Sequence, residues 1–237
     1  MMLKALSADL LKIRGKGIWF LVALGPVGVI AMQALNYGLR YDYLTKQYAG
    51  RLWETLLDNI LMFVPIALYL GVTLVSSLLA NVEHGTNAWK QLLALPISRN
   101  AVFGAKFALS VLLLAVSCCL LAVGTIALGL LLKFGTDIPY LAILRLSFLP
   151  FLASFPALAL MLWLCMTMKN QALPVTLGVM AGVVSVFSPN LSEWFPLNWP
   201  IFGYEGPRQE LFAGAGLLCG ALILLVGAIH FNKKDVD

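Results

Sequence analysis

Residues 103–132 read FGAKFALSVLLLAVSCCLLAVGTIALGLLL, a continuous apolar run in which Lys106 is the one charged side chain. A run of this kind is typical of a helix that crosses a membrane, which needs about 20 apolar residues. This run is longer than a single crossing needs. We therefore expect its helix to tilt or to extend beyond the bilayer.

The composition of the whole chain agrees with a protein embedded in lipid. Of 237 residues, 61% are hydrophobic and 11% are charged, and the mean hydropathy is +0.90. A soluble domain usually carries about a quarter charged residues, so this chain lacks the polar surface of a soluble enzyme. Its net charge of +5 comes from basic residues that flank apolar runs, as membrane topology requires. No nucleic-acid partner is expected.

Further apolar runs on both sides of this segment predict an all-α integral membrane protein with a single transmembrane domain, residues 1–237. Six spans are expected, at about residues 17–36, 60–80, 103–132, 141–168, 172–188 and 211–231. Prolines should interrupt two of these helices, at Gly25-Pro26 in the first span and at Pro150 and Pro156 in the fourth. Residues 37–59 are expected to form a polar loop whose aromatic side chains lie at the membrane interface.

The segment 2–15 predicts an amphipathic helix that lies on the membrane surface. Apolar side chains that include Leu6 and Leu10 recur there at spacings of three and four, with polar side chains between or after them: Lys4, Asp9, Lys12, Arg14 and Lys16. Its cations favour the anionic cytoplasmic leaflet. A frayed polar terminus is the alternative. The apolar run that follows lacks a small-x-small cleavage site, so it is expected to be retained as the first span.

The distribution of charge between the loops predicts the orientation. With the N-terminus in the cytoplasm, ten basic residues fall in inside segments and six in outside segments, whereas four acidic residues fall inside and seven outside. Because cytoplasmic loops carry an excess of Lys and Arg, both termini are expected to be cytoplasmic. An even number of spans agrees with that arrangement.

The sequence contains no pattern for catalysis. HExxH, GxSxG and the phosphate-binding pattern GxxxxGK[ST] are absent, so the chain itself is not expected to bind or hydrolyse ATP. No carboxylate pair lies within a span, although ionisable groups inside the membrane mark pumps and proton relays. A membrane enzyme or an ion-coupled carrier would therefore lack its usual residues. No catalytic, cofactor-binding or metal site is expected.

The segment 81–99, between the second and third spans, reads NVEHGTNAWKQLLALPISR. One face of a short helix there would be apolar and made by Trp89, Leu92, Leu93 and Pro96. Thr86 or Asn87 can cap its start, Pro96 ends it, and Ser98 is expected to cap the next helix. Such a helix can dock in a groove of a cytoplasmic partner. An ordinary interfacial loop helix is the alternative.

This segment resembles the coupling segment of type-2 ABC exporter permeases, whose pattern is an acidic residue, Gly-Thr or a similar pair, two leucines, Leu-Pro-x-Ser-Arg and then a lysine. The matching positions are Glu83, Gly85, Thr86, Leu92, Leu93, Leu95, Pro96, Ser98, Arg99 and Lys106. Glu83-His84 and Trp89-Lys90 are most similar to the lantibiotic-immunity and bacitracin-type permeases. Gly85 departs from the immunity branch, where a longer polar residue is expected.

The resemblance implies roles for three segments. The N-terminal helix would be a connecting helix on the inner leaflet, with Leu6, Leu10, Lys12 and Arg14 at the interface. Residues 83–95 would be a coupling helix, and the ATPase-coupling residues would be Glu83, His84, Thr86, Trp89, Leu92, Leu93, Pro96 and Arg99. Residues 189–210 would form two short re-entrant helices between spans five and six, with Trp194 and Trp199 as a candidate outer gate. A plain extracellular loop is the alternative there.

The resemblance also implies partners. Two ABC ATPase subunits would hold ATP and Mg, and a second permease, identical or homologous, would complete the membrane part of an exporter. The machine would lie among the lipids of the bacterial plasma membrane. It would export an amphipathic or peptide-like substrate, such as a lantibiotic, and thereby give antibiotic resistance. The alternatives are another small-molecule or lipid-like cargo and a membrane scaffold that does not transport.

Overall fold

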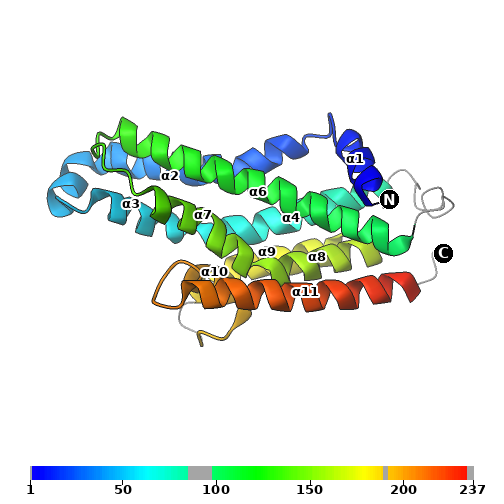
Figure 1. The fold of residues 1–237 in the computed structure, drawn as a ribbon. Coiled ribbons are helices and arrows are strands. Elements are labelled where there is room, and N and C mark those ends of the chain that lie inside the picture. Colours follow the sequence, from blue (N-terminus) through cyan, green and yellow to red (C-terminus); the bar gives the residue numbers. More distant parts are fainter. Residues whose placement is uncertain (1, 85–97, 189–191, 234–237) are drawn as a thin grey trace.

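The computed structural model describes residues 2–84, 98–188 and 192–233, and every regular element in those ranges is a helix (Figure 1). The elements are α1 (Met2–Lys12), α2 (Ile18–Gln47), α3 (Leu52–Leu61), α4 (Val64–His84), α6 (Arg99–Leu131), α7 (Tyr140–Ala153), α8 (Phe155–Thr167), α9 (Ala172–Phe187), a 3₁₀ turn η2 (Pro196–Asn198), α10 (Trp199–Phe202) and α11 (Gln209–Lys233). The all-α class is confirmed.

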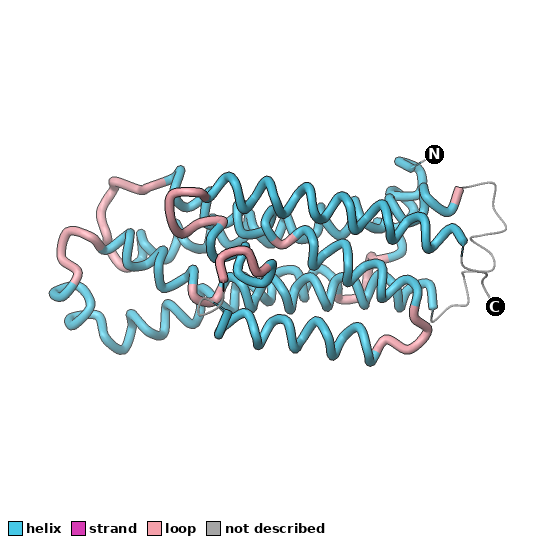
Figure 2. Tube along the Cα trace, turned by 90° about the horizontal axis from the view of Figure 1, so that it is seen from below, coloured by secondary structure: helices cyan, strands magenta, loops and turns pink. Residues whose placement is uncertain are grey.

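The helices form an elongated bundle with two unlike ends (Figures 1 and 2). At one end, which we name the terminal end, lie α1, the last turn of α4, the first turn of α6 and the last turn of α11. The opposite end, which we name the α3 end, carries α3 and the loop 132–139. Between the two ends α2 packs on α6, α4 on α8 and α9, and α11 on α7 and α8.

Four of the described helices are long and apolar enough to cross a membrane, namely α2, α4, α6 and α11. The helices α7 and α8 pass the same test as a pair bent by 46°, which gives a fifth candidate span if the pair is one span. The apolar helix α9 has 16 residues and is shorter than the about 20 that a crossing needs. The chain is a membrane protein with four or five candidate spans, and the count of six stays a prediction.

The interruption predicted for the fourth span is confirmed. The break between α7 and α8 falls at Ser154, between the two prolines, and Pro156 lies in the first turn of α8. Proline is tolerated in a first turn because the N–H that it lacks would have no partner there. In α2 the kink falls at Arg40 (φ −128°, ψ 26°), and Pro26 lies inside the helix. The kink expected at Gly25-Pro26 stays a prediction, since the helix is assigned continuously through Pro26.

The polar loop predicted for residues 37–59 is wrong. α2 continues to Gln47 and α3 begins at Leu52, so a turn of four residues remains between them. Tyr37 and Trp53 are buried, and each packs edge-on against Phe134, with ring centroids 5.4 Å and 5.9 Å apart. Burial of these aromatic side chains in a tertiary cluster outweighs the polar character of the surrounding sequence.

Glycines let α11 approach α7 and α8 closely. A Cβ added at Gly216 would lie 2.5 Å from the Cα of Ala153, and one at Gly220 would lie 2.9 Å from the backbone carbon of Phe155. Between helices in lipid, such close approach of small residues is a main source of association. Gly214 has open space beside it, with nothing within 4 Å of an added Cβ. Close contact along this helix is therefore made at Gly216 and Gly220 and not at Gly214.

Candidate functional site

A buried ion pair joins α1 to α6 at the terminal end. The Nζ of Lys106 lies 2.9 Å from the Oδ1 of Asp9, and the two side chains are 1% and 6% exposed. Lys106 lies in the second turn of α6, a helix that Ser98 starts by accepting a hydrogen bond from the Ala101 N–H, as expected. A buried pair at hydrogen-bonding distance fixes α1 against this helix, because neither charge can be left alone in an apolar site.

The remaining residues predicted for the N-terminal helix lie around this pair. Leu6 and Leu10 pack against the buried apolar cluster that includes Ile13 and Phe103. Lys12 approaches the same Asp9 carboxylate at 4.0 Å, and Arg14 is exposed. The pattern of α1 is thus explained by contact with the bundle, and Asp9 is buried, not solvated as its place in the polar set suggested.

Polar contacts also tie α11 to α6 and α8 at the terminal end. The Nη1 of Arg99 donates to the carbonyl oxygen of Asn232 over 3.2 Å, and the Nδ2 of Asn232 donates to the Oδ1 of Asn100. The indole N–H of Trp163 in α8 donates to the Nδ1 of His230 over 3.1 Å. The first two turns of α6 therefore contact both α1 and the end of α11.

Three of the predicted ATPase-coupling residues are described by the structure, and they lie at the terminal end. Glu83 and His84 form the last residues of α4, and Arg99 begins α6. Thr86, Trp89, Leu92, Leu93 and Pro96 lie outside the described residues. What the structure does place are the two helices that flank the segment 85–97. Both reach the terminal end, where α1 and the last turn of α11 also lie.

The two tryptophans predicted as an outer gate have different environments. Trp194 is 61% exposed, whereas Trp199, the first residue of α10, is 8% exposed. Both lie near Phe212 of α11: the Trp194 ring centroid is 6.1 Å from that of Phe212, and Trp199 belongs to the same buried cluster. In the described part of 189–210, η2 and α10 are single short turns, and a re-entrant course stays a prediction.

Tyr69 of α4 connects this helix to η2. Its side chain is 2% exposed, and its hydroxyl lies 3.3 Å from the carbonyl oxygen of Leu197 and 3.4 Å from that of Pro196, so it can donate to either. α4 therefore contacts η2 through Tyr69 near its start, and its other end, at His84, leads directly into residue 85. Sequence reasoning missed this contact because it joins residues 127 and 128 positions apart.

Replacing Tyr69 by phenylalanine is expected to cost about 0.5–1.5 kcal/mol, the usual net value of one intramolecular hydrogen bond. The loss should loosen η2 and α10, so limited proteolysis should cut within residues 192–208 faster than in the wild type. Tyr140→Phe, at a tyrosine that is 59% exposed, serves as the control and should leave the cleavage rate unchanged. Equal cleavage in both variants would contradict the anchoring role of the hydroxyl.

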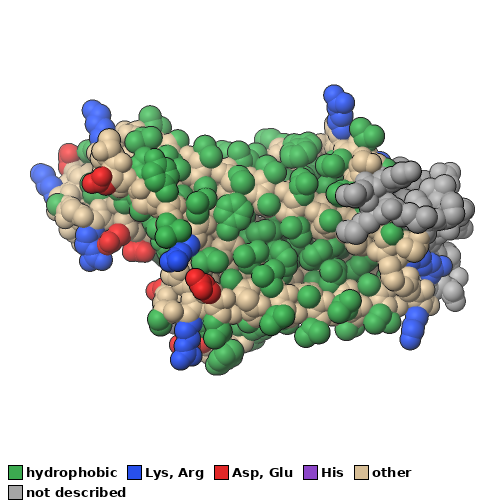
Figure 3. Space-filling model, in the orientation of Figure 1, with side chains coloured by type: hydrophobic (Ala, Val, Ile, Leu, Met, Phe, Trp, Pro, Cys, Tyr) green, Lys and Arg blue, Asp and Glu red, His purple; other side chains and the backbone are tan. Residues whose placement is uncertain are grey.

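Lys and Arg side chains lie at both ends of the bundle, whereas the acidic side chains visible in Figure 3 gather toward the α3 end. The basic residues that the structure describes at the terminal end are Lys4, Lys12, Arg14, Lys16, Arg99, Lys106, Lys169 and Lys233, and the acidic residues described with them are Asp9 and Glu83. The acidic residues at the α3 end, or in the loops on that side, are Asp42, Glu54, Asp58, Asp137, Glu193, Glu205 and Glu210. An excess of cations at one end is what the positive-inside rule expects of the cytoplasmic end.

Acidic groups on α3 influence the loop that follows α10. Burial raises the pKa of the Tyr204 hydroxyl, and the charges of Asp58 and Glu54 raise that pKa further. Burial also raises the pKa of Asp58 itself. Arg51 and Glu54 form an ion pair at 2.7 Å, but both side chains are largely exposed, and such pairs contribute little to stability.

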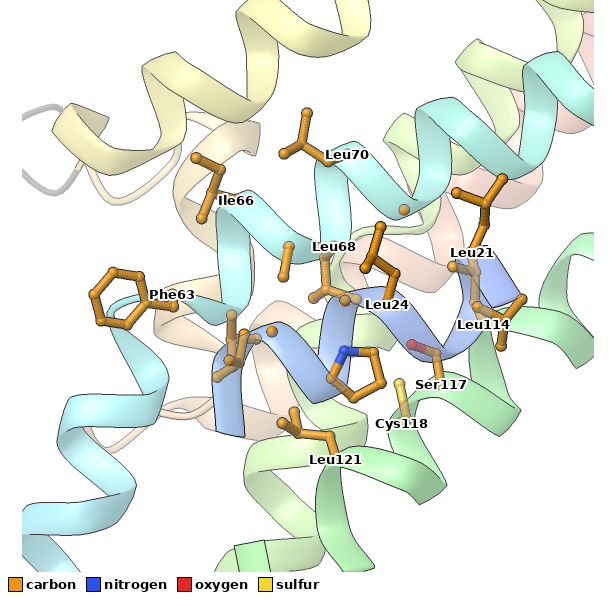
Figure 4. Close-up of a pocket in the computed structure, with 18 of the residues that line it drawn as sticks. Leu21, Leu24, Phe63, Ile66, Leu68, Leu70, Leu114, Ser117, Cys118 and Leu121 are labelled. Atoms are coloured by element: carbon orange, nitrogen blue, oxygen red, sulfur yellow. The ribbon is translucent and has the colours of Figure 1, made fainter. Parts of the chain in front are cut away.

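An apolar pocket of about 330 Å³ lies between α2, α4 and α6 (Figure 4). Its lining comes mainly from residues 21–32 and 63–75, with a smaller share from 114–121. The lining contains no charged side chain, and its polar side chains are Ser117, Ser147 and the thiol of Cys118. Among the described residues, no group of three His, Cys, Asp or Glu side chains is placed to hold a metal ion.

The ion pair of Asp9 and Lys106 is the main feature that sequence reasoning missed. Its signal was present, since Asp9 is the one acidic residue before Asp42 and Lys106 is the one charged residue between Arg99 and Lys133. A lone charge beside or within an apolar run has to find a partner of opposite sign if it is buried. That rule identifies Asp9 and Lys106 as residues that need a partner, but it does not predict that they are partners of each other.

Comparison with known proteins gives one match. The family model described as ABC-2 family transporter protein matches residues 5–185, which include most of α1, the described helices α2 to α8 and most of α9. Neither the curated proteins nor the solved structures gave a match.

Proposed function

This chain belongs to the ABC-2 transporter family, and we propose that it is the membrane half of an ATP-driven exporter for an amphipathic or peptide-like cargo. Members of this family are the membrane permeases of ABC transporters, transport subunits that are not enzymes. They normally work with ATPase subunits. The proposal adds the number and site of those subunits, the direction of transport and the cargo.

The observation that carries the proposal is the convergence at the terminal end. The helices on either side of residues 85–97 end there, and α6 is fixed there to α1 by the Asp9–Lys106 pair. A subunit that docks on 85–97 would therefore act on α4, α6 and α1 together. Two ATPase subunits, each carrying ATP and Mg, would close on ATP binding and move these helices in two paired permeases.

The charge difference between the ends supports a cytoplasmic terminal end in a bacterial plasma membrane. Cations described there far outnumber the acidic residues described there, and an ATPase that uses cellular ATP has to dock on the cytoplasmic side. The η2 and α10 turns would then lie toward the exterior. Movement of α4 would reach them through Tyr69.

The cargo class is inferred from the spans. The sequence carries no charged residue within 18–39, 64–82, 109–131 or 211–229, so these segments offer no charged partner for a free ion. An amphipathic molecule that leaves the bilayer can present its apolar part to such helices. A lantibiotic or another antimicrobial peptide fits this description and agrees with the resemblance of residues 81–99.

Reconstitution tests the function directly. The chain would be purified with its co-purifying ATPase and placed in proteoliposomes, and ATP-dependent movement of a labelled cationic antimicrobial peptide would be followed. Vanadate, which traps ABC ATPases, should abolish the movement. A complex that hydrolyses ATP but moves neither this peptide nor other amphipathic probes would be a scaffold or carry a different cargo, and either result would overturn the proposal.

Trp89→Ala is expected to reduce co-purification of the ATPase subunit by about tenfold or more, because a tryptophan anchor in a docking groove is commonly worth 2 or more kcal/mol, as a rough guide. Glu83→Ala should weaken the association in the same direction. The amount of ATPase that remains with affinity-purified permease measures the effect. Trp194→Ala is the matched control, since this exposed tryptophan lies on the opposite side. Equal ATPase recovery from all three variants would exclude residues 83–95 as the docking site.

A further inference from the structure

We propose that the pocket between α2, α4 and α6 is a binding site for one acyl chain of a membrane phospholipid. The pocket measures about 330 Å³, which falls at the lower end of the about 300–1,000 Å³ typical of ligand pockets. This inference depends on the chain lying in a membrane, which its family and helices show. It does not depend on transport.

The pocket lies in a part of the bundle that lipid surrounds. All three helices that line it are candidate spans, and the lining residues lie well inside them, at 21–32 of α2 and 114–121 of α6. Leu24 and Met32 on its rim are 48% and 50% exposed, and Leu74 on the other side is 39% exposed. The pocket is therefore open between α2 and α4, toward the hydrocarbon that surrounds the bundle.

The length of the pocket matches one lipid leaflet. Residues 21–32 of α2 extend for about 17 Å at about 1.5 Å per residue. Half of a hydrocarbon core of about 30 Å is about 15 Å, which is the depth that one acyl chain fills. The pocket is thus long enough for one chain and too short for a molecule that spans the bilayer.

The chemistry of the lining fits an occupant without polar groups. In Figure 4 the side chains of Leu24 and Leu68 lie between α2 and α4, and that of Leu121 extends from α6 toward α2. The Ser147 hydroxyl donates to the carbonyl oxygen of Ile143 in its own helix, so it is already used. A peptide backbone placed here would leave its N–H and C=O groups without sufficient partners, at a cost of several kcal/mol per group, as an order of magnitude. A hydrocarbon chain carries no such cost.

Two glycines keep the pocket open. Gly25 and Gly28 of α2 both line it, and neither has any atom within 4 Å of the place where a Cβ would be added. An added Cβ at either position meets no protein atom, so a leucine there is expected to take up free space of the pocket. The glycines therefore provide a way to fill the pocket while leaving the helix packing intact.

Photo-crosslinking tests the proposal with the full chain in nanodiscs, using phosphatidylcholine that carries a diazirine in the middle of one acyl chain and no transport cargo. In the wild type, adducts should concentrate on peptides that contain 21–32 and 63–75, compared with the lipid-exposed face of α11. Gly28→Leu, and independently Gly25→Leu, should lower those adducts by about tenfold, the change that about 1.4 kcal/mol of lost affinity produces. Gly38→Leu is the control, because Gly38 lies in α2 outside the pocket and also faces open space.

Three results would overturn the proposal. Adducts spread evenly over all lipid-facing helices would show no site, and adducts that persist in both pocket-filling variants would place the chain elsewhere. A cysteine at position 24 that forms a disulfide with its counterpart in another copy would show that a second permease covers the pocket. Because the probe is a phospholipid and no cargo is present, positive labelling cannot come from the exported molecule, and failed transport would leave this result unaffected.

Discussion

Lys106→Met is expected to lower the free energy of unfolding by about 3–5 kcal/mol, the usual cost of removing one partner from a buried ion pair. The Asp9 carboxylate would remain 6% exposed without its partner at 2.9 Å. Lys12, at 4.0 Å and on the same short helix, is too distant and too exposed to replace it. Equilibrium unfolding in mixed detergent micelles, followed by tryptophan fluorescence, measures the change.

Two further variants separate the pair from a general effect of substitution. Lys169→Met makes the same change at an exposed lysine of the terminal end and should alter stability by less than about 0.5 kcal/mol, as is usual at surface positions. The double variant Asp9→Leu/Lys106→Met should recover most of the loss, because apolar replacement of a whole buried pair is often neutral or stabilising. A single variant as stable as the wild type would mean that the pair does not hold α1.

Gly216→Leu should prevent α11 from packing on α7. The atoms nearest to an added Cβ are backbone atoms, the Cα of Ala153 at 2.5 Å and the carbonyl oxygen of Leu152 at 2.6 Å. Backbone cannot move aside as a side-chain end can, so the cost should exceed the about 1–3 kcal/mol typical of overpacking. The expected result is loss of most monodisperse protein in size-exclusion chromatography after extraction in mild detergent.

Gly214→Leu is the matched control, two residues away in the same helix. No atom lies within 4 Å of its added Cβ, so a leucine there meets only the surroundings of the bundle. This variant should be recovered in amounts close to those of the wild type. If both variants were recovered equally well, the close approach of α11 to α7 would not be required for folding.

Much of the fold follows from the sequence because the apolar runs are long. The runs around 103–132 and 211–231 predicted α6 and α11 to within a few residues, and the prolines on either side of Ser154 predicted the break in the fourth span. Each of these signals is local. A chain segment in lipid has to form its backbone hydrogen bonds internally, as a helix does. The bounds of an apolar run therefore predict the bounds of the helix closely.

The features that escaped prediction depend on contacts between distant residues. The helix over residues 37–47 is apparent only once Tyr37 is seen to pack on Phe134. The pairing of Asp9 with Lys106 and the contact of Tyr69 with η2 have the same character. For the candidate site, the motif over 83–99 identified the segment, and Trp89 and its neighbours remain to be tested by association with an ATPase.

The distance in sequence between Asp9 and Lys106 has a consequence for biosynthesis. The two residues are separated by 97 positions, so during translation the carboxylate emerges from the ribosome long before its lysine exists. While the two apolar segments of α2 and α4 are made, Asp9 lacks the partner that it has in the folded protein. α1 can form its ion pair with α6 only after the segment that begins at Arg99 has entered the bilayer. We therefore expect the contact between α1 and α6 to form at that insertion step.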